Sequence, residues 1–252
     1  MKKRTVLTMG AVLCMAMTAF ASESDVAEEQ PVDIESTEED VKTADELEVT
    51  QKNLYELSGE YYSDQGYFFA KVENNTSEGR YVGDGKLVCF SEDDDVLVSA
   101  NYVTSSPCSN IWLEPGEYCY VYESIWEDEL EESDIADVKF SIKSGEYGYI
   151  GERVECEAEF FYSEEDTYNN EIYVTYSNPK DEPTDCFYIA VALLDEEDNI
   201  LYVGQERLYN VKLHPGSTVT QTISISAGLC EYFVENGIVP ASVDAQVYYI
   251  EN

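Results

Sequence analysis

The chain has 252 residues, and its 53 acidic side chains against 14 basic ones give a formal net charge of −39. A surface this acidic repels nucleic-acid backbones and anionic lipid head groups, so we expect no nucleic-acid partner and favour neutral or cationic partners. The sequence contains one histidine, His214, which excludes any site that needs two histidines.

Residues 1–21 have the pattern of a secretory signal peptide. Lys2, Lys3 and Arg4 precede a short apolar run, and Ala19-Phe20-Ala21 resembles the small-residue cleavage site. The apolar run is shorter than a membrane-spanning helix. We therefore expect a secreted or extracytoplasmic, cell-surface associated protein whose mature chain does not span a membrane.

Residues 22–52 are predicted to form a disordered acidic linker. Between Ser22 and Thr50 there are 12 acidic residues, one lysine and no aromatic residue. Such a segment cannot bury enough apolar surface to offset the entropy lost on ordering. Capture of a basic partner by this segment is the functional alternative.

From Leu54 onward the sequence is typical of a β protein. Apolar and polar residues alternate in 154–160, 219–225 and 243–250, as half-buried strands require. Helix is scarce: residues 228–237 are predicted to form one or two turns that end at Gly237, and residues 126–136 are a weaker candidate.

An internal repeat of about one hundred residues organises this β region. Four landmarks recur in the same order at offsets of 100 to 104. The paired segments are Tyr62-Ser63 with Tyr162-Ser163, Val72–Asn75 with Thr175–Asn178, Leu87–Leu97 with Val191–Leu201, and Leu113–Gly116 with Leu213–Gly216. Roughly seven short strands per copy predict an all-β protein of two tandem immunoglobulin-like β-sandwiches, copy 1 at 53–145 and copy 2 at 146–252.

The strand Val191-Ala-Leu-Leu-Asp195, followed by an acidic turn and a later Leu-x-Pro-Gly, resembles the FxLYD domain family of Gram-positive bacteria. Val191 and Leu194 stand where that family has Phe and Tyr. The resemblance covers most of residues 55–252. It implies secreted or surface-attached immunoglobulin-like modules, and it brings no catalytic residues with it.

Six cysteines remain after residue 21, three in each copy. An odd number per domain and ordinary core residues at the repeat-equivalent positions favour buried free thiols. Cys108 and Cys119, which flank the Leu-x-Pro-Gly turn, are the best candidates for a single disulfide. No pair has the Cys-x-x-Cys spacing of a redox or zinc site.

Two acidic turns are the candidates for a metal site. Carboxylate oxygens are the ligands that calcium prefers, although Asp and Asn are also common in turns for conformational reasons. The calcium candidates are Asp93, Asp94, Asp95, Asp195, Glu197 and Asp198. The plain solvated turn is the favoured alternative, and no other cofactor is expected.

The chain also contains 21 tyrosines, which suit both strands and recognition surfaces. We expect some tyrosines of 118–122 and 248–249 to be exposed. The functional hypothesis is a noncatalytic binding or interaction module for a protein or glycan at the cell surface. The alternatives are a glycan-acting hydrolase with paired carboxylates and a ligand-free spacer.

Overall fold

The computed structural model describes residues 47–59, 62–125, 135–208 and 211–251. The predicted signal peptide, most of the acidic linker and most of the candidate helix at 126–136 lie outside these ranges. Strand β1 begins at Glu48, inside the segment assigned to the linker, because Leu47 and Val49 pack into a hydrophobic core.

The described residues form β-strands and one short helix, so the prediction of an all-β protein is confirmed. The elements are β1 (Glu48–Gly59), β2 (Tyr62–Glu73), β3 (Arg80–Phe90), β4 (Val96–Val103), β5 (Ser105–Ser106), β6 (Trp112–Leu113), β7 (Tyr118–Ile125), β8 (Asp137–Gly145), β9 (Glu152–Val154), β10 (Cys156–Phe161), β11 (Glu171–Ser177), β12 (Phe187–Leu194), β13 (Ile200–Arg207), β14 (Thr218–Ser224), α1 (Ala227–Asn236) and β15 (Ser242–Tyr249).

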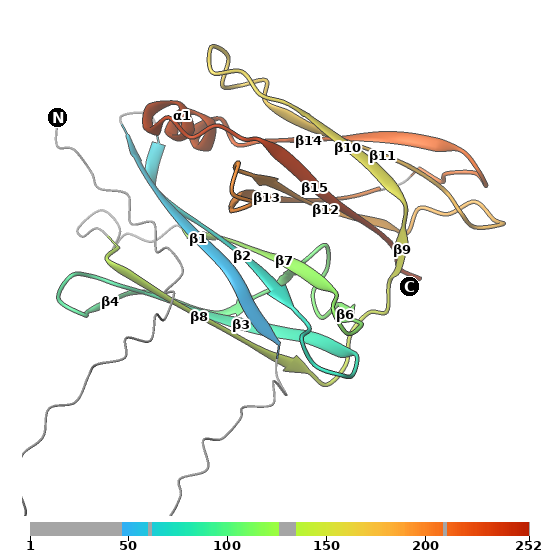
Figure 1. Ribbon diagram of the computed structural model, residues 1–252, viewed down its shortest axis with the longest axis horizontal. Helices are drawn as coiled ribbons and strands as arrows, with labels where there is room; N and C mark the ends of the chain where they lie inside the picture. The colour runs from blue at the N-terminus through green and yellow to red at the C-terminus, as the bar shows by residue number, and fades with distance from the viewer. Residues whose placement is uncertain (1–46, 60–61, 126–134, 209–210, 252) are drawn as a thin grey trace, which may run out of the picture. The chain divides into compact units, whose positions relative to one another are not determined.

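These strands pair into four antiparallel sheets within the compact unit 42–252. We name them sheet A (β1-β2-β7-β5), sheet B (β4-β3-β6, with β8 also on β3), sheet D (β13-β12-β15-β9) and sheet E (β10-β11-β14). Figure 1 shows the order of the layers, with sheet A between B and D, and sheet D between A and E.

The local sequence explains the outer elements. In β10 the glutamates are exposed while Cys156, Ala158 and Phe160 pack against the core, which is the alternation predicted for this segment. Helix α1 ends at Gly237, whose φ of 65° is the left-handed conformation that glycine adopts at helix C-termini. The predicted helix at 228–237 is therefore confirmed.

The described residues up to Gly145 and those after it, which we call the first and second halves of the unit, make the same hydrogen bonds at two buried asparagines. The side-chain amide of Asn74 donates to the carbonyl oxygens of Glu78 and Leu113, and that of Asn178 donates to those of Glu182 and Leu213. The backbone carbonyls of the same asparagines accept from Gly116 and Gly216. Each asparagine thus ties a strand end to a Leu-x-Pro-Gly turn.

The structure also corrects two of the landmark pairings. Asn74 and not Asn75 is the equivalent of Asn178, a shift of one residue from the expected pairing. Tyr62 begins β2, whereas Tyr162 follows the end of β10, so this pair does not occupy equivalent places. A short sequence match can be aligned one residue too early or too late. The shared buried hydrogen bonds show which residues are equivalent.

Sheet A is buried on both of its faces. Phe68 and Phe69 are adjacent in β2 and both are 0% exposed; Phe68 packs toward sheet B and Phe69 toward sheet D. Successive strand residues point to opposite faces, so one strand supplies both cores. The strand therefore lacks the apolar-polar alternation of a half-buried strand.

Three tyrosines of β7 line the face of sheet A that meets sheet D. Tyr118, Tyr120 and Tyr122 are two residues apart and share this face, while Cys119 and Val121 face sheet B. Tyr120 is buried in this interface, whereas Tyr118 and Tyr122 are partly exposed, so the expectation that some tyrosines of this segment are exposed holds for two of the three. We call these three residues the tyrosine row.

One carboxylate anchors the tyrosine row across the interface. The hydroxyls of Tyr118 and Tyr120 both donate to Oδ2 of Asp244 in β15, at 2.7 and 2.6 Å. Gln246, two residues further along β15, donates to the backbone carbonyl of Tyr118 at 3.1 Å. Burial and the nearby Asp244 charge raise the pKa of Tyr120, so this hydroxyl stays protonated and donates.

All six cysteines in the described part of the chain are free thiols, and no disulfide joins Cys108 to Cys119. Cys89, Cys119 and Cys230 are buried in the hydrophobic cores. Burial raises the pKa of both the Cys89 and the Cys108 thiol to about 12. These thiols act as small apolar side chains and have little thiolate character.

Replacing Asp244 is expected to loosen the interface between sheets A and D. Asp244→Ala leaves the hydroxyls of the partly buried Tyr118 and the buried Tyr120 without their acceptor. It should lower the free energy of unfolding by about 2–4 kcal/mol, measured by urea denaturation. Asp244→Asn, which keeps one acceptor oxygen, should lose less. Glu235→Ala on the exposed end of α1 is the control, and an equal loss there would contradict the assignment.

Reducing agent is expected to leave the thermal midpoint of the protein unchanged, because the fold contains free thiols at all six described cysteine positions. Thiol labelling of Cys89 and Cys108 in the native protein at pH 8 should be slow, since burial keeps these two thiols protonated. A midpoint that falls on reduction, and falls no further in Cys108→Ala, would instead establish a bridge at Cys108.

Candidate functional site

A pocket of about 320 Å³ lies where the two halves of the compact unit meet. We call it the junction pocket. Five separate stretches of the sequence contribute to it, and none of its lining residues carries a formal charge. The lining residues are Thr104, Ser105, Pro107, Cys108, Ser109, Tyr149, Tyr188, Gln205 and Ile250.

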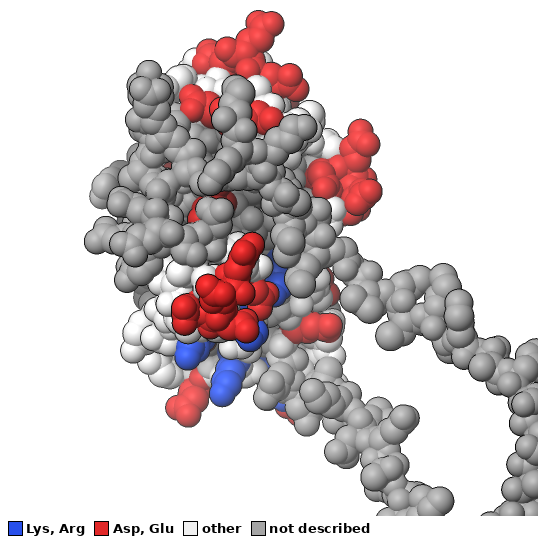
Figure 2. All heavy atoms as spheres, turned by 90° about the vertical axis from the view of Figure 1, so that its left-hand side faces the viewer, with Lys and Arg blue, Asp and Glu red and all other residues white. Residues whose placement is uncertain are grey.

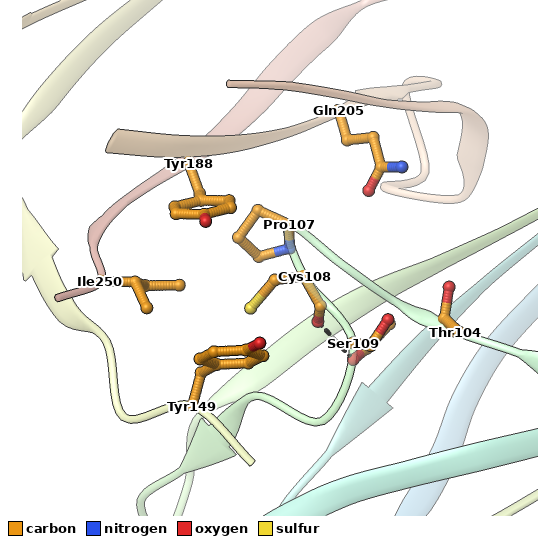
Figure 3. Close-up of a pocket in the computed structure, with 9 residues that line it drawn as sticks. Thr104, Pro107, Cys108, Ser109, Tyr149, Tyr188, Gln205 and Ile250 are labelled. Carbon is orange, nitrogen blue, oxygen red and sulfur yellow. Dashed lines mark hydrogen bonds between the residues drawn. The ribbon is translucent and has the colours of Figure 1, made fainter. Parts of the chain in front are cut away.

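Two aromatic rings form opposite walls of the junction pocket. In Figure 3 the ring of Tyr188 lies above and that of Tyr149 below, with Ile250 on the left, Pro107 on the right and the Cys108 thiol between the two rings in this view. Gln205 lies further along the opening. The volume is within the range of small-molecule sites, and the mixture of apolar walls with a few polar groups is typical of them.

Backbone contacts hold Tyr149 in place on the segment between β8 and β9. Its N–H donates to the carbonyl of Asn110 at 3.0 Å, and its own carbonyl accepts from Trp112 at 2.8 Å. The preceding Gly148 lies so close to Asn110 that an added Cβ would be 1.7 Å from the Asn110 carbonyl oxygen. Only glycine allows this approach, which places the Tyr149 side chain at the pocket.

Tyr188 comes from β12, the strand at the centre of sheet D. The Arg207 guanidinium lies 4.5 Å from the centre of the Tyr188 ring, in a cation–π arrangement. Burial raises the pKa of Tyr188, so the hydroxyl is protonated near neutral pH and is able to donate. A central strand and a stacked guanidinium together fix the orientation of this wall.

The uncharged lining contrasts with the rest of the surface. On the face shown in Figure 2, acidic side chains appear in several groups, and the basic side chains gather in the lower part of the view. Among the described residues, exposed Lys86, Lys139 and Lys143 lie on β3 and β8 of sheet B. The junction pocket is therefore a neutral site in a strongly acidic protein.

Exposed apolar side chains flank the lining residue Tyr149 in the sequence. Tyr147 is 75% exposed and Ile150 is 67% exposed, on either side of Tyr149 at 48%. Large exposed apolar residues close to a pocket often mark a binding surface. Tyr102 and Tyr168 are also strongly exposed, but neither lines this pocket.

The structure places the six calcium candidates in two hairpin turns, one in each half. Asp93, Asp94 and Asp95 lie between β3 and β4, and Asp195, Glu197 and Asp198 lie between β12 and β13. Among the described residues, no three His, Cys, Asp or Glu side chains are arranged to hold a metal ion.

The turns are held by their own hydrogen bonds. Asp195 Oδ1 accepts from the backbone N–H groups of Glu197 and Asn199 at 2.9 and 2.8 Å, and Oδ2 accepts from the Asn199 amide at 2.9 Å. In the turn between β3 and β4, Ser91 Oγ accepts from the N–H groups of Asp93 and Asp95 in the same way. The carboxylate of Asp195 thus has a turn-forming role.

A second, smaller pocket of about 190 Å³ lies on the outer face of sheet E. It is lined by Glu157, Ala158, Glu159, Tyr173 and Thr175. Its two glutamates share one face of β10 and are exposed. Of the two pockets described here, this one has a pair of carboxylates in its lining.

Sequence patterns did not reveal the junction pocket. Of its lining residues, only Cys108 was singled out beforehand, as half of a disulfide that is not formed. The local signal was the segment Gly145-Glu-Tyr-Gly-Tyr-Ile-Gly151, which exposes three large side chains among three glycines. Its partners on β12 and β13 are apparent only once the halves are docked.

Asp195 is expected to stabilise the protein in a pH-dependent way. Burial acts to raise its pKa, but the hydrogen bonds from Asn199 and Glu197 outweigh this and lower it. A lowered native pKa adds stability above the unfolded-state pKa of about 3.9, and this stability is lost as pH falls through the native value. Asp195→Ala should therefore cost about 1 kcal/mol at pH 7 and less below pH 4 in urea unfolding.

Asp195→Ser is the matched control, because serine performs this role at position 91. It should retain most of the stability lost in Asp195→Ala. Calcium binding at the turns stays a prediction, and a saturable calcium-dependent rise in the thermal midpoint that Asp195→Ser abolishes would establish it.

In the described part of the chain, no helix has the length and apolar character needed to cross a membrane. No protein-family model matches the chain, and the search of curated proteins found no similar sequence.

Proposed function

We propose that this protein is an extracytoplasmic, noncatalytic binding module made of two tandem immunoglobulin-like β-sandwiches, and that it binds its partner at the junction pocket. The pattern of residues 1–21 supports export. The repeated asparagine and acidic-turn hydrogen bonds, together with the resemblance to FxLYD domains, support the two-sandwich architecture.

One observation carries the proposal of a binding site. Tyr149 and Tyr188 stand at opposite walls of an open pocket whose lining residues are all uncharged, at the contact between the two halves. Tyrosine offers a large contact area, a polar tip and a small loss of side-chain entropy, which is why it is enriched at recognition surfaces. Sites at such contacts are common in binding proteins.

The hydrolase alternative has less support at this pocket. Paired-carboxylate hydrolysis needs two Asp or Glu side chains flanking the scissile bond, and the junction pocket has neither residue type in its lining. Glu157 and Glu159 at the second pocket are a pair of carboxylates that a hydrolase could use. Turnover of a glycan that is lost in Glu157→Gln or Glu159→Gln would favour this alternative.

Replacing Tyr149 with alanine is expected to weaken binding to cell-envelope fragments of the producing organism at least tenfold, measured by co-sedimentation with the purified protein. The substitution removes the aromatic ring that forms one wall of the pocket. Because the Tyr149 side chain is about half exposed, its loss leaves the hydrophobic cores intact. Tyr168→Ala, at a more exposed tyrosine outside the pocket, is the matched control and should bind like the unaltered protein.

Two results would contradict the proposal. Binding that is equally strong in Tyr149→Ala and the unaltered protein would place the site elsewhere on the molecule. No binding to the fragments by the unaltered protein would favour the ligand-free spacer.

A further inference from the structure

We infer that the junction pocket takes an uncharged sugar residue of a glycan, an inference that rests on the proposed binding function. A sugar ring presents apolar C–H faces and many hydroxyl groups, so its site needs flat apolar walls together with several neutral hydrogen-bonding groups. The junction pocket combines both of these features.

The walls fit the faces of such a ring. Tyr188 and Tyr149 present aromatic surfaces above and below the pocket in the view of Figure 3, and Ile250 lies on one side. Ile250 is 1% exposed and Tyr149 is held by two backbone hydrogen bonds, so the walls are in place before a ligand arrives. Preformed walls reduce the entropic cost of binding.

The polar groups of the pocket are available for hydroxyl groups. In the described part of the chain, the side-chain hydroxyls of Thr104, Ser109, Tyr149 and Tyr188 make no hydrogen bond to protein. The oxygen of the Gln205 amide accepts from Ser106 at 3.2 Å, which orients the amide and leaves its nitrogen to donate. These groups match a ligand that both donates and accepts at several points.

Charge distinguishes the sugar from other ligands. The −39 net charge repels anionic sugars, and the uncharged lining offers them no compensating cation. A cationic head group would seek an aromatic face, but the Arg207 guanidinium already stacks on Tyr188 at 4.5 Å and would repel it. An uncharged sugar ring is the class of ligand that avoids both of these electrostatic penalties.

The test is isothermal titration of the purified protein with neutral tetrasaccharides of glucose, galactose, mannose and N-acetylglucosamine, and with a tetramer of galacturonic acid. At least one neutral tetrasaccharide should bind saturably, and the acidic tetramer should bind at least tenfold more weakly. Raising the salt concentration should reduce the difference in affinity between the neutral and acidic ligands, because salt screens the repulsion between the acidic protein and the acidic tetramer.

Variants locate the binding. Tyr149→Ala should weaken it at least tenfold, Gln205→Ala and Tyr188→Phe should each weaken it several-fold, and Tyr168→Ala should leave it unchanged. Tyr188→Phe keeps the ring and its packing and removes only the hydroxyl, so its effect reports hydrogen bonding and not loss of fold.

Binding of none of the neutral tetrasaccharides at millimolar concentration would overturn the inference, as would equal or tighter binding of the acidic tetramer. If Tyr149-dependent sedimentation with envelope fragments survives in that case, the binding function stands and the sugar class fails. Loss of that sedimentation after protease treatment of the fragments would identify a protein partner. Absence of any sedimentation would mean that the binding function itself has failed.

Discussion

The contact of the tyrosine row with Asp244 is the interaction on which the arrangement of the two halves depends. Tyr118 and Tyr120 place two hydroxyls on one carboxylate oxygen, and the remainder of the face is covered by apolar and aromatic side chains of sheet D. An isolated carboxylate in such a place would be costly. Two donated hydrogen bonds offset that cost and fix the register of one half against the other.

Comparison of the corresponding strands explains why sheets E and B do not form such a contact within the described part of the chain. The strand β14 is the equivalent of β7, and the positions of the tyrosine row are occupied there by Thr218, Thr220 and Thr222, which are exposed. On the other side, the position equivalent to Asp244 on sheet B is Lys139. Sheets E and B therefore present solvated outer faces, as the terminal units of stacked repeats do.

The sequence predicted the elements whose signals are local. The helix that ends at Gly237, the alternation in β10 and the hydroxylated outer face of β14 were expected from spacing alone and are confirmed. Each of these features depends on residues that are a few positions apart and lie on the same strand face or in the same turn.

The sequence did not predict which faces meet. The three tyrosines of β7 have the spacing of one strand face, yet nothing local distinguishes a face covered by another sheet from one open to solvent. The junction pocket has the same origin, because Tyr149, Tyr188 and Gln205 come from three separate parts of the chain. The roles of these residues depend on packing between segments that are distant in the sequence, and the local sequence pattern does not predict that packing.

The interface between sheets A and D and the junction pocket are formed by the same packing of the two halves. Sheet A is held against β12 and β15 by Asp244 and Gln246, and the same docking brings Pro107 and Cys108 of the first half against Tyr188 and Ile250 of the second. Any change that lets the halves separate must open the pocket as well, although it touches no lining residue. If the junction pocket binds a ligand as proposed, the tyrosine row contributes to that binding indirectly, by keeping the two walls of the pocket in register.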